Sequence, residues 1–185
     1  GGEEELLKLS GQNNGEIKNV MILGGGRVGK KVAEDLSSDS ISVKLVEINK
    51  ERAEELAEEL AECLVIYGDG TNSELLDEEH LDQMDAFIAV TGDSETNIMS
   101  SLIAKAKGIN KTIALVDNLD YYKLTQISGI DTLINKKLLA ADAISKHVHK
   151  AEVVAISQLD NMDAELLEFV VKENSKVCNK TIKDL

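Results

Sequence analysis

The sequence has few aromatic residues and fewer basic than acidic side chains. Aromatic residues make up 3% of the 185 positions, and there is no tryptophan and no proline. This scarcity argues against a surface on which nucleic-acid bases stack. Acidic residues number 34 against 20 lysines and arginines, so the formal net charge is −14. Because such a charge repels a phosphate backbone, we expect no nucleic-acid partner.

Long apolar runs and cysteine pairs are also missing. No stretch approaches the roughly 20 apolar residues that cross a bilayer. The first residues, Gly-Gly-Glu-Glu-Glu, lack the basic and apolar parts of a signal peptide. We therefore expect a soluble, cytoplasmic protein with no direct membrane insertion. Cys63 and Cys178 form no CxxC pair, so they indicate neither a metal site nor a redox motif.

A glycine-rich turn organises the chain. The apolar segment Val20–Leu23 leads into Gly24, Gly26 and Gly29, which have the G-x-G-x-x-G spacing. In this pattern the first glycine permits a sharp turn, the second lets the backbone approach a phosphate, and the third lets a helix pack against a strand. The N-terminus of that helix offers N–H groups and the positive end of its dipole to a pyrophosphate.

An acidic residue follows where a dinucleotide site needs one. The segment from Ile41 to Val46 alternates as a strand and ends at Glu47, about 20 positions beyond the glycines, as in the dinucleotide-binding fingerprint. A carboxylate there accepts hydrogen bonds from ribose hydroxyls and repels a 2′-phosphate, so the sequence favours NAD over NADP. The alternative is a tight strand–helix turn with a surface glutamate and no ligand.

Strand-like and helix-like segments alternate along the chain from Val20 to Ile134. This alternation predicts an α/β fold, a Rossmann-like doubly wound parallel sheet with helices on both faces. Its ligand crevice should lie beyond the carboxyl ends of the strands. We expect strands over 20–23, 41–47, 63–67, 85–91, 112–116 and 132–134, and helices over 50–62, 73–80, 94–107, 119–128 and 137–150.

Local patterns sharpen three of these expectations. Residues 63–67 are apolar without alternation, which is typical of a strand inside a parallel sheet. Thr71 and Glu74 have the spacing of a capping box for the helix at 73–80. The helix at 94–107 is expected to direct its apolar face inward, namely Ile98, Met99, Leu102, Ile103 and Ala106.

The composition divides the chain into three parts. Residues 1–19 read as a polar lead-in with a linker, and residues 20–150 as the nucleotide-binding domain with its long last helix. Residues 151–185 contain two β-like runs, too few for an independent core, so we interpret them as the incomplete start of a small α+β lobe. The linker at the start suggests a piece of a longer protein.

Three motifs together resemble the RCK (KTN) domain family, which regulates the conductance of K⁺. They are the glycine turn at Ile22–Gly29, the turn at Gly68–Thr71 and the segment Ala89–Asn97. The resemblance is greatest to the regulatory subunits of Trk potassium-uptake systems. Those subunits carry two such halves in tandem, and this chain looks like a second half.

The resemblance implies binding of NAD or NADH and, as in relatives, of ATP or ADP. It also assigns the residues of the site. The phosphates would lie on the turn formed by Gly24, Gly25, Gly26, Arg27, Val28 and Gly29, with Arg27 paired to them. Glu47 would hold the adenosine ribose with Asn49 nearby, Asp69 and Gly70 would border the adenine, and Thr91 and Gly92 would border the far ribose or nicotinamide.

For function, the resemblance implies a cytoplasmic regulatory subunit that binds a nucleotide without chemistry. It would gate a membrane potassium-translocating (TrkH-like) subunit by conformational change, as a homodimer or with a tandem RCK partner, at the inner face of the membrane. The glycine fingerprint alone leaves open a fragment of an NAD-dependent dehydrogenase. That enzyme needs a general acid or base beside the nicotinamide, and no His, Lys or Tyr constellation offers one.

The remaining reactive side chains receive structural interpretations. His147 and His149 are two positions apart, so a helix places them on different faces and they cannot share a metal ion. The acidic runs around Glu58 and Glu78 are interpreted as solvated helix faces. Ser100 and Ser101 have no His–Asp pair near them in sequence, so a hydrolase triad has no support. We therefore expect neither catalytic residues nor a metal site.

Overall fold

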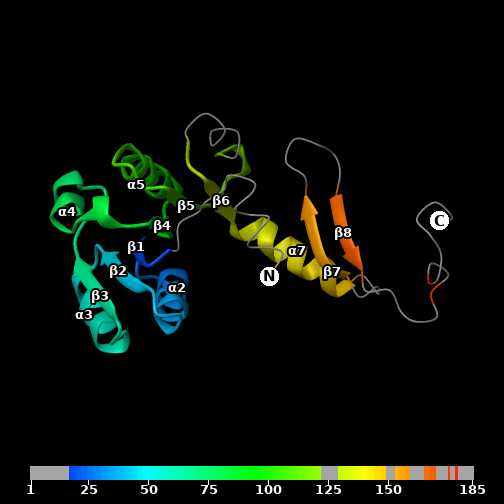
Figure 1. The fold of residues 1–185 in the computed structure, drawn as a ribbon, viewed down its shortest axis with the longest axis horizontal. Helices are drawn as coiled ribbons and strands as arrows, with labels where there is room; N and C mark the ends of the chain where they lie inside the picture. The colour runs from blue at the N-terminus through cyan, green and yellow to red at the C-terminus, as the bar shows by residue number, and fades with distance from the viewer. Residues whose placement is uncertain are drawn as a thin grey trace. The chain divides into compact units, whose positions relative to one another are not determined.

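The computed structural model describes residues 17–121, 129–148, 153–158 and 165–169, together with Ser175 and Cys178. The chain divides into two compact units, residues 1–135 and 136–185 (Figure 1). The long helix expected at 137–150 falls in the second unit by its contacts. The division of the chain into a lead-in, a nucleotide-binding domain and a second lobe, with boundaries after residues 19 and 150, stays a prediction.

The first unit is built on a six-stranded sheet in the order β3-β2-β1-β4-β5-β6 with every pairing parallel. The strands are β1 (Asn19–Leu23), β2 (Ser42–Glu47), β3 (Cys63–Tyr67), β4 (Ala86–Ala89), β5 (Lys111–Val116) and β6 (Thr132–Asn135). This arrangement confirms the doubly wound α/β fold. The strand order reverses between β1 and β4, which is where such sheets bind ligands.

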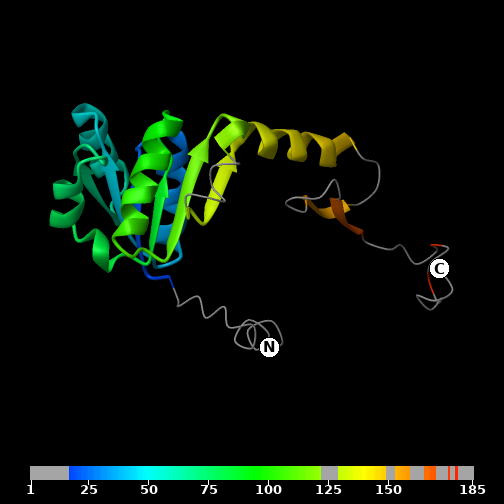
Figure 2. The same cartoon turned by 90° about the horizontal axis from the view of Figure 1, so that it is seen from above.

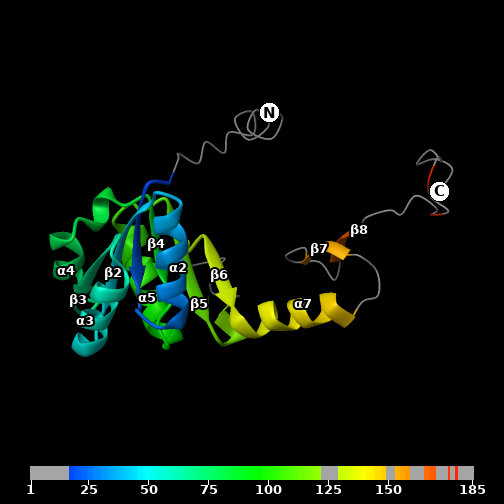
Figure 3. The same ribbon diagram turned by 90° about the horizontal axis from the view of Figure 1, so that it is seen from below.

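Helices cover both faces of the sheet because side chains alternate along β1. Val20 and Ile22 pack against α2 and α3 on one face, whereas Met21 and Leu23 pack against α4 and α5 on the other (Figure 2 and Figure 3). The helices are α2 (Arg27–Ser38), α3 (Lys50–Glu59), α4 (Ser73–Glu78) and α5 (Ser94–Ala106), with 3₁₀ turns at η1 (Leu81–Gln83) and η2 (Leu119–Tyr121). The near-continuous apolar run of β1 is thus explained by burial on both sides.

The expectation that residues 63–67 form an interior strand is wrong. β3 is the edge strand of the sheet, and Leu64 and Tyr67 are 54% and 59% exposed. An apolar run without alternation therefore reflects, in this case, apolar residues that face solvent at an edge.

The inward face predicted for α5 is only partly right. Ile103 packs against the core, and Ile98 and Leu102 are partly buried, but Met99 is 57% exposed and Ala106 is exposed. The buried face of α5 consists instead of small and polar residues, namely Asn97, Ser100, Ser101 and Ala104. Small side chains let the helix approach β4 and β5 closely, and the hydrogen bonds of Asn97 described below fix its rotation.

The helix caps agree with expectation at α3 and differ at α4. Asn49 caps α3, because its side chain accepts a hydrogen bond from the Arg52 N–H at 2.8 Å. At α4 the predicted capping box is absent, and Asn72 accepts from the Glu74 N–H at 2.9 Å. Thr71 does not cap α4, since its N–H and hydroxyl both donate to Asp69 Oδ1. The side chain of Asp69 thus forms an Asx turn with Thr71, the residue that would have been the N-cap of the capping box.

The second unit contains α7 (Lys136–Val148) and an antiparallel pair of β7 (Val153–Gln158) and β8 (Glu165–Phe169). These elements confirm the expected helix and both expected strands, with shifted ends. Of the helix expected at 119–128 only η2 is described, and the rest lies outside the described residues, as do residues 1–16 and His149. Among the described residues no helix is long and apolar enough to cross a membrane.

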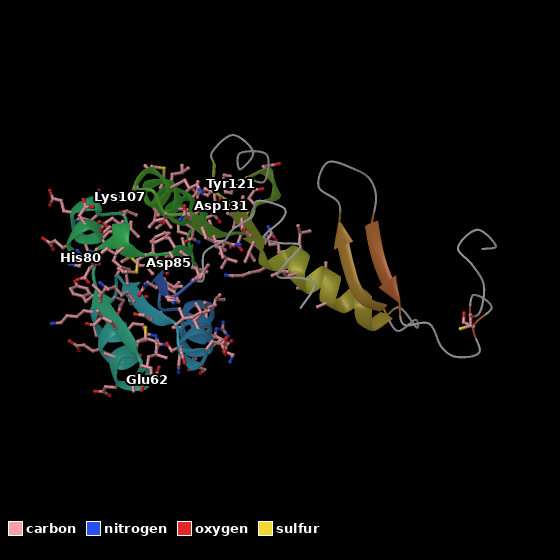
Figure 4. All side chains as sticks on the ribbon, viewed as in Figure 1. Glu62, His80, Asp85, Lys107, Tyr121 and Asp131 are labelled. Carbon is pink, nitrogen blue, oxygen red and sulfur yellow. The ribbon has the colours of Figure 1, made fainter. Side chains whose placement is uncertain are left out.

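Asp131 ties three elements together at the end of the sheet where β6 begins (Figure 4). Its Oδ2 accepts hydrogen bonds from the N–H and the hydroxyl of Thr112 on β5, each at 2.8 Å. Lys105 Nζ of α5 lies 2.8 Å from both carboxylate oxygens. Burial alone raises the pKa of Asp131, but these donors outweigh it and hold the pKa below its usual value.

We expect Asp131→Asn to lower the free energy of unfolding by about 1 kcal/mol at pH 7, a modest figure because the carboxylate is one-third exposed. The folded-state pKa is lowered, so this contribution is present above the unfolded pKa of about 3.9 and is lost as the pH falls through the folded value. Urea unfolding of both proteins between pH 7 and pH 3 measures it. Glu58→Gln, an exposed position, is the matched control, and a penalty for Asp131→Asn that does not shrink on acidification would contradict the argument.

Candidate functional site

A cleft of about 460 Å³ opens beyond the carboxyl ends of the first four strands. The loops that follow β1, β2, β3 and β4 form its walls. Its lining residues are Leu23, Gly24, Gly26, Val46, Glu47, Ile48, Asp69, Gly70, Val90, Thr91, Gly92, Asp93 and Thr96. The cleft therefore lies at the edge of the sheet that the sequence predicted.

The three glycines of the fingerprint have distinct surroundings. Gly24 has a φ of +105°, and a Cβ there would lie 2.9 Å from the backbone N of Thr91. A Cβ on Gly29 would lie 1.8 Å from the carbonyl oxygen of Gly24, so only glycine lets α2 begin this close to the turn. A Cβ on Gly26 would meet no atom within 4 Å. Gly26 thus borders open space in the cleft, the room that a phosphate requires.

The N-terminus of α2 differs from the other helix starts of the sheet. Its N-cap is Gly26, which supplies no side-chain hydrogen bond, and its first turn has no acidic residue. In contrast, Asn49, Asn72 and Asp93 cap α3, α4 and α5 through side-chain oxygens. Because Gly26 lines the cleft, α2 presents uncapped N–H groups and its positive dipole end to any anion there.

Glu47 lines the cleft and also holds the glycine turn by a hydrogen bond. Its Oε2 accepts a hydrogen bond from the Gly25 N–H at 2.6 Å, and its Oε1 accepts from the Asn49 N–H at 2.8 Å. Arg52 donates from Nε to the Gly25 carbonyl oxygen at 3.2 Å. The peptide groups of Gly25 are therefore held from both sides, and the carboxylate keeps further lone pairs for ribose hydroxyls. The sequence did not indicate this anchoring of the glycine turn.

The structure brings seven of the predicted site residues into the cleft lining: Gly24, Gly26, Glu47, Asp69, Gly70, Thr91 and Gly92. The other five lie beside it. Gly25 and Gly29 are buried, Arg27 and Val28 are exposed on the first turn of α2, and Asn49 caps α3. The role of each residue in binding stays a prediction.

The predicted site residues did not include six of the lining residues, namely Leu23, Val46, Ile48, Val90, Asp93 and Thr96. The four aliphatic ones end strands or follow them, so their place at the carboxyl edge could have been inferred. Asp93 and Thr96 begin α5, where Asp93 accepts from the Thr96 N–H at 2.7 Å. The spacing of this N-cap pair was a usable signal.

Asn97 holds the wall of the cleft formed by the loop after β4. It is 1% exposed, and its Oδ1 accepts from the N–H and the hydroxyl of Thr91 at 2.9 and 2.7 Å. Its Nδ2 donates to the carbonyl oxygens of Thr91 and Leu115 at 3.2 and 2.8 Å. The last paired residues of β4 and β5 are Ala89 and Ala114, so this amide continues the link between the strands just beyond the ladder.

The lining can bind a polar ligand but offers little for catalysis. The described lining residues include three carboxylates and two threonines, and no His, Lys, Cys or Tyr. Hydrogen bonds from the side chain and the N–H of Thr96 hold the pKa of Asp93 below its usual value, which makes it a poor proton donor near neutral pH. Within the described part of the chain no group of three metal-ligating side chains occurs.

The family model described as the TrkA-N domain matches residues 20–136. The chain is 40% identical over 171 residues to the Trk system potassium uptake protein TrkA of Vibrio alginolyticus, covering 91% of this chain and 37% of that protein. It is 36% identical over 173 residues to the TrkA protein of Halomonas elongata, covering 92% and 38%. The chain thus spans well under half the length of these curated relatives.

Solved structures share the fold at low sequence identity. The TrkA-N domain of the inner membrane protein ybaL from Escherichia coli is similar with a TM-score of 0.65 and 20% identity, covering 72% of this chain and 98% of that one. The GsuK channel bound to NAD is similar with a TM-score of 0.64 and 17% identity, covering 78% and 26%. GsuK bound to ADP has a TM-score of 0.64 and 16% identity, covering 75% and 36%.

Proposed function

The chain belongs to the TrkA-N (RCK) family, and on that footing we propose that it is the nucleotide-binding part of a regulatory subunit of a Trk-type potassium-uptake system. It binds NAD or NADH in the cleft, as GsuK is described bound to NAD, and ADP or ATP compete for the same place. The observation that carries this proposal is the uncapped N-terminus of α2 at Gly26, which opens into the cleft that Glu47 also lines. A helix start left free of its own cap is suited to a pyrophosphate.

In this proposal the protein acts by binding and not by chemistry. The nucleotide shifts the assembly only because it binds one arrangement of the paired domains better than another. A coupling free energy of about 1–3 kcal/mol is typical of such regulation. The partners are a second RCK domain, in a homodimer or in tandem, and a membrane potassium-translocating subunit at the cytoplasmic face.

The test of the proposed function is a competition series on the 185-residue chain. NAD, NADH, ADP and ATP are titrated by calorimetry, and each is then displaced by the others. Saturable one-site binding with mutual displacement supports the proposal, whereas no binding of any of the four overturns it. Incubation with NADH and a panel of carbonyl compounds separates it from the dehydrogenase alternative, because robust hydride transfer would identify an enzyme.

We expect Glu47→Ala to weaken NAD binding by roughly 1.5–3 kcal/mol, the range for a charged hydrogen-bond partner. Two effects add in the same direction, since the variant loses the ribose acceptor and also the bond that holds the Gly25 N–H. Calorimetric titration with NAD measures the change, and Glu58→Ala at an exposed position of α3 is the control. Equal affinity in the Glu47 variant and the wild type would make the carboxylate an ordinary surface group.

A further inference from the structure

The charges along the cleft are arranged unevenly. Glu47 ends β2, Asp69 and Asp93 follow β3 and β4, and the glycine turn follows β1. Because the strand order is β3-β2-β1-β4, the glycine turn lies between two carboxylate-lined walls. No lysine or arginine is among the described lining residues. Arg52 is occupied by the Gly25 carbonyl and by Glu55, whose Oε2 lies 2.8 Å from Nη1.

Two helices begin at this cleft, and one N-terminus attracts an anion whereas the other repels it. The α2 start is uncapped at Gly26. The α5 start carries its own anion, because Asp93 Oδ1 accepts from the Thr96 N–H at 2.7 Å and both residues line the cleft. This carboxylate is ionised at neutral pH, as an ordinary aspartate is, and the Thr96 hydrogen bonds hold its pKa below its usual value. An anion is therefore favoured beside β1 and disfavoured beside β4.

We propose that Asp93 is a specificity-determining residue that selects, among nucleotides, those whose negative charge is confined to the middle of the molecule. The inference rests on the proposed function and refines it. A dinucleotide places its pyrophosphate at α2 and an uncharged or cationic riboside beside Asp93. A mononucleotide that binds its adenosine on the Glu47 side directs its terminal phosphate toward Asp93 instead. That group carries about two negative charges at neutral pH, since its second pKa is about 6.

The order of affinity follows from this arrangement. NAD⁺ should bind most tightly, ADP less tightly and ATP least, because the γ-phosphate extends furthest toward α5. The discrimination comes from repulsion and not from an added contact, which is a common route to specificity.

The experiment compares the wild-type chain with Asp93→Asn. Asparagine caps a helix about as well as aspartate, so the Thr96 N–H keeps its acceptor while the charge is removed. Calorimetric titration with NAD⁺, ADP and ATP should show that Asp93→Asn tightens ATP binding about 5–10-fold, as expected for a charge pair across a partly solvated cleft. The affinity for NAD⁺ should not rise, because its cationic nicotinamide is not repelled by Asp93, and the gain for ATP should shrink at high salt.

Two further variants keep the test decisive. Glu58→Gln removes one negative charge from an exposed position of α3, and it should leave the ratio of the ATP and NAD⁺ dissociation constants unchanged. Asp93→Ser, a neutral N-cap residue, should reproduce the effect if Asp93→Asn does not fold.

Different results would contradict the proposed nucleotide binding and the role of Asp93. A wild-type chain that binds none of the nucleotides contradicts the proposed function itself. A chain that binds NAD⁺ but keeps the same ATP to NAD⁺ ratio in both Asp93 variants leaves that function standing and overturns the inference. A wild-type preference for ATP over NAD⁺ also overturns it.

Discussion

Gly26→Val should abolish nucleotide binding while the fold survives. Gly26 has a φ of −67°, which valine adopts readily, and a Cβ there meets no protein atom within 4 Å. The valine side chain therefore fits the protein and fills the space in front of the α2 N-terminus. A ligand phosphate could then no longer reach the N–H groups, and we expect a loss of at least about 100-fold in NAD affinity, or ~3 kcal/mol. The cost in stability should be about 1 kcal/mol, because Gly26 is the N-cap of α2 and valine is a poorer N-cap residue than glycine.

The measurement pairs calorimetric titration with thermal unfolding, and Gly29→Ala provides the contrast. A Cβ at Gly29 would lie 1.8 Å from the Gly24 carbonyl oxygen, so that variant should lose stability along with binding. Gly26→Ala, which adds only a methyl group, should fall between the wild type and Gly26→Val in affinity. Undiminished NAD binding by a folded Gly26→Val protein would show that no phosphate lies in front of α2.

The parts of this molecule that the sequence predicted well are those specified by neighbouring residues. The glycine turn, the strand ending at Glu47 and the alternation of strands and helices each depend on short spacings in the chain. Parallel pairing then brings the four loop ends together without further information. For this reason seven of the predicted site residues line one cleft.

The features that could not be predicted from the sequence depend on contacts between residues that lie far apart in the chain. Whether β3 lies inside the sheet or at its edge is decided by the order of strands, which an apolar run does not encode. The second role of Glu47 is a bond to Gly25, 22 positions away. The rotation of α5 follows the hydrogen-bonding needs of Thr91 and Leu115 rather than the position of its apolar residues.

Asn97 is the residue whose replacement is expected to have the largest effect on stability. Asn97→Ala should lower the free energy of unfolding by about 3–5 kcal/mol, because the Thr91 N–H and the carbonyl oxygens of Thr91 and Leu115 lose a buried partner at about 1–3 kcal/mol each, partly offset by relaxation. Binding of NAD should weaken as well, since Thr91 and Gly92 line the cleft and the loop that carries them loses its anchor. Urea unfolding and calorimetric titration measure the two effects.

Ser100→Ala is the matched control on the same buried face of α5. Ser100 is 0% exposed, but its hydroxyl bonds only to carbonyl oxygens of its own helix, at Thr96 and Asn97. Ser100→Ala should therefore lower the free energy of unfolding by less than about 1 kcal/mol and leave NAD binding unchanged, because those carbonyl oxygens belong to the backbone of the same helix. If Asn97→Ala lowered the free energy of unfolding no more than Ser100→Ala does, the hydrogen bonds of the Asn97 amide would not contribute to stability. A large difference between them would mean that a buried polar residue, and not the apolar stripe, orients α5 and with it one wall of the cleft.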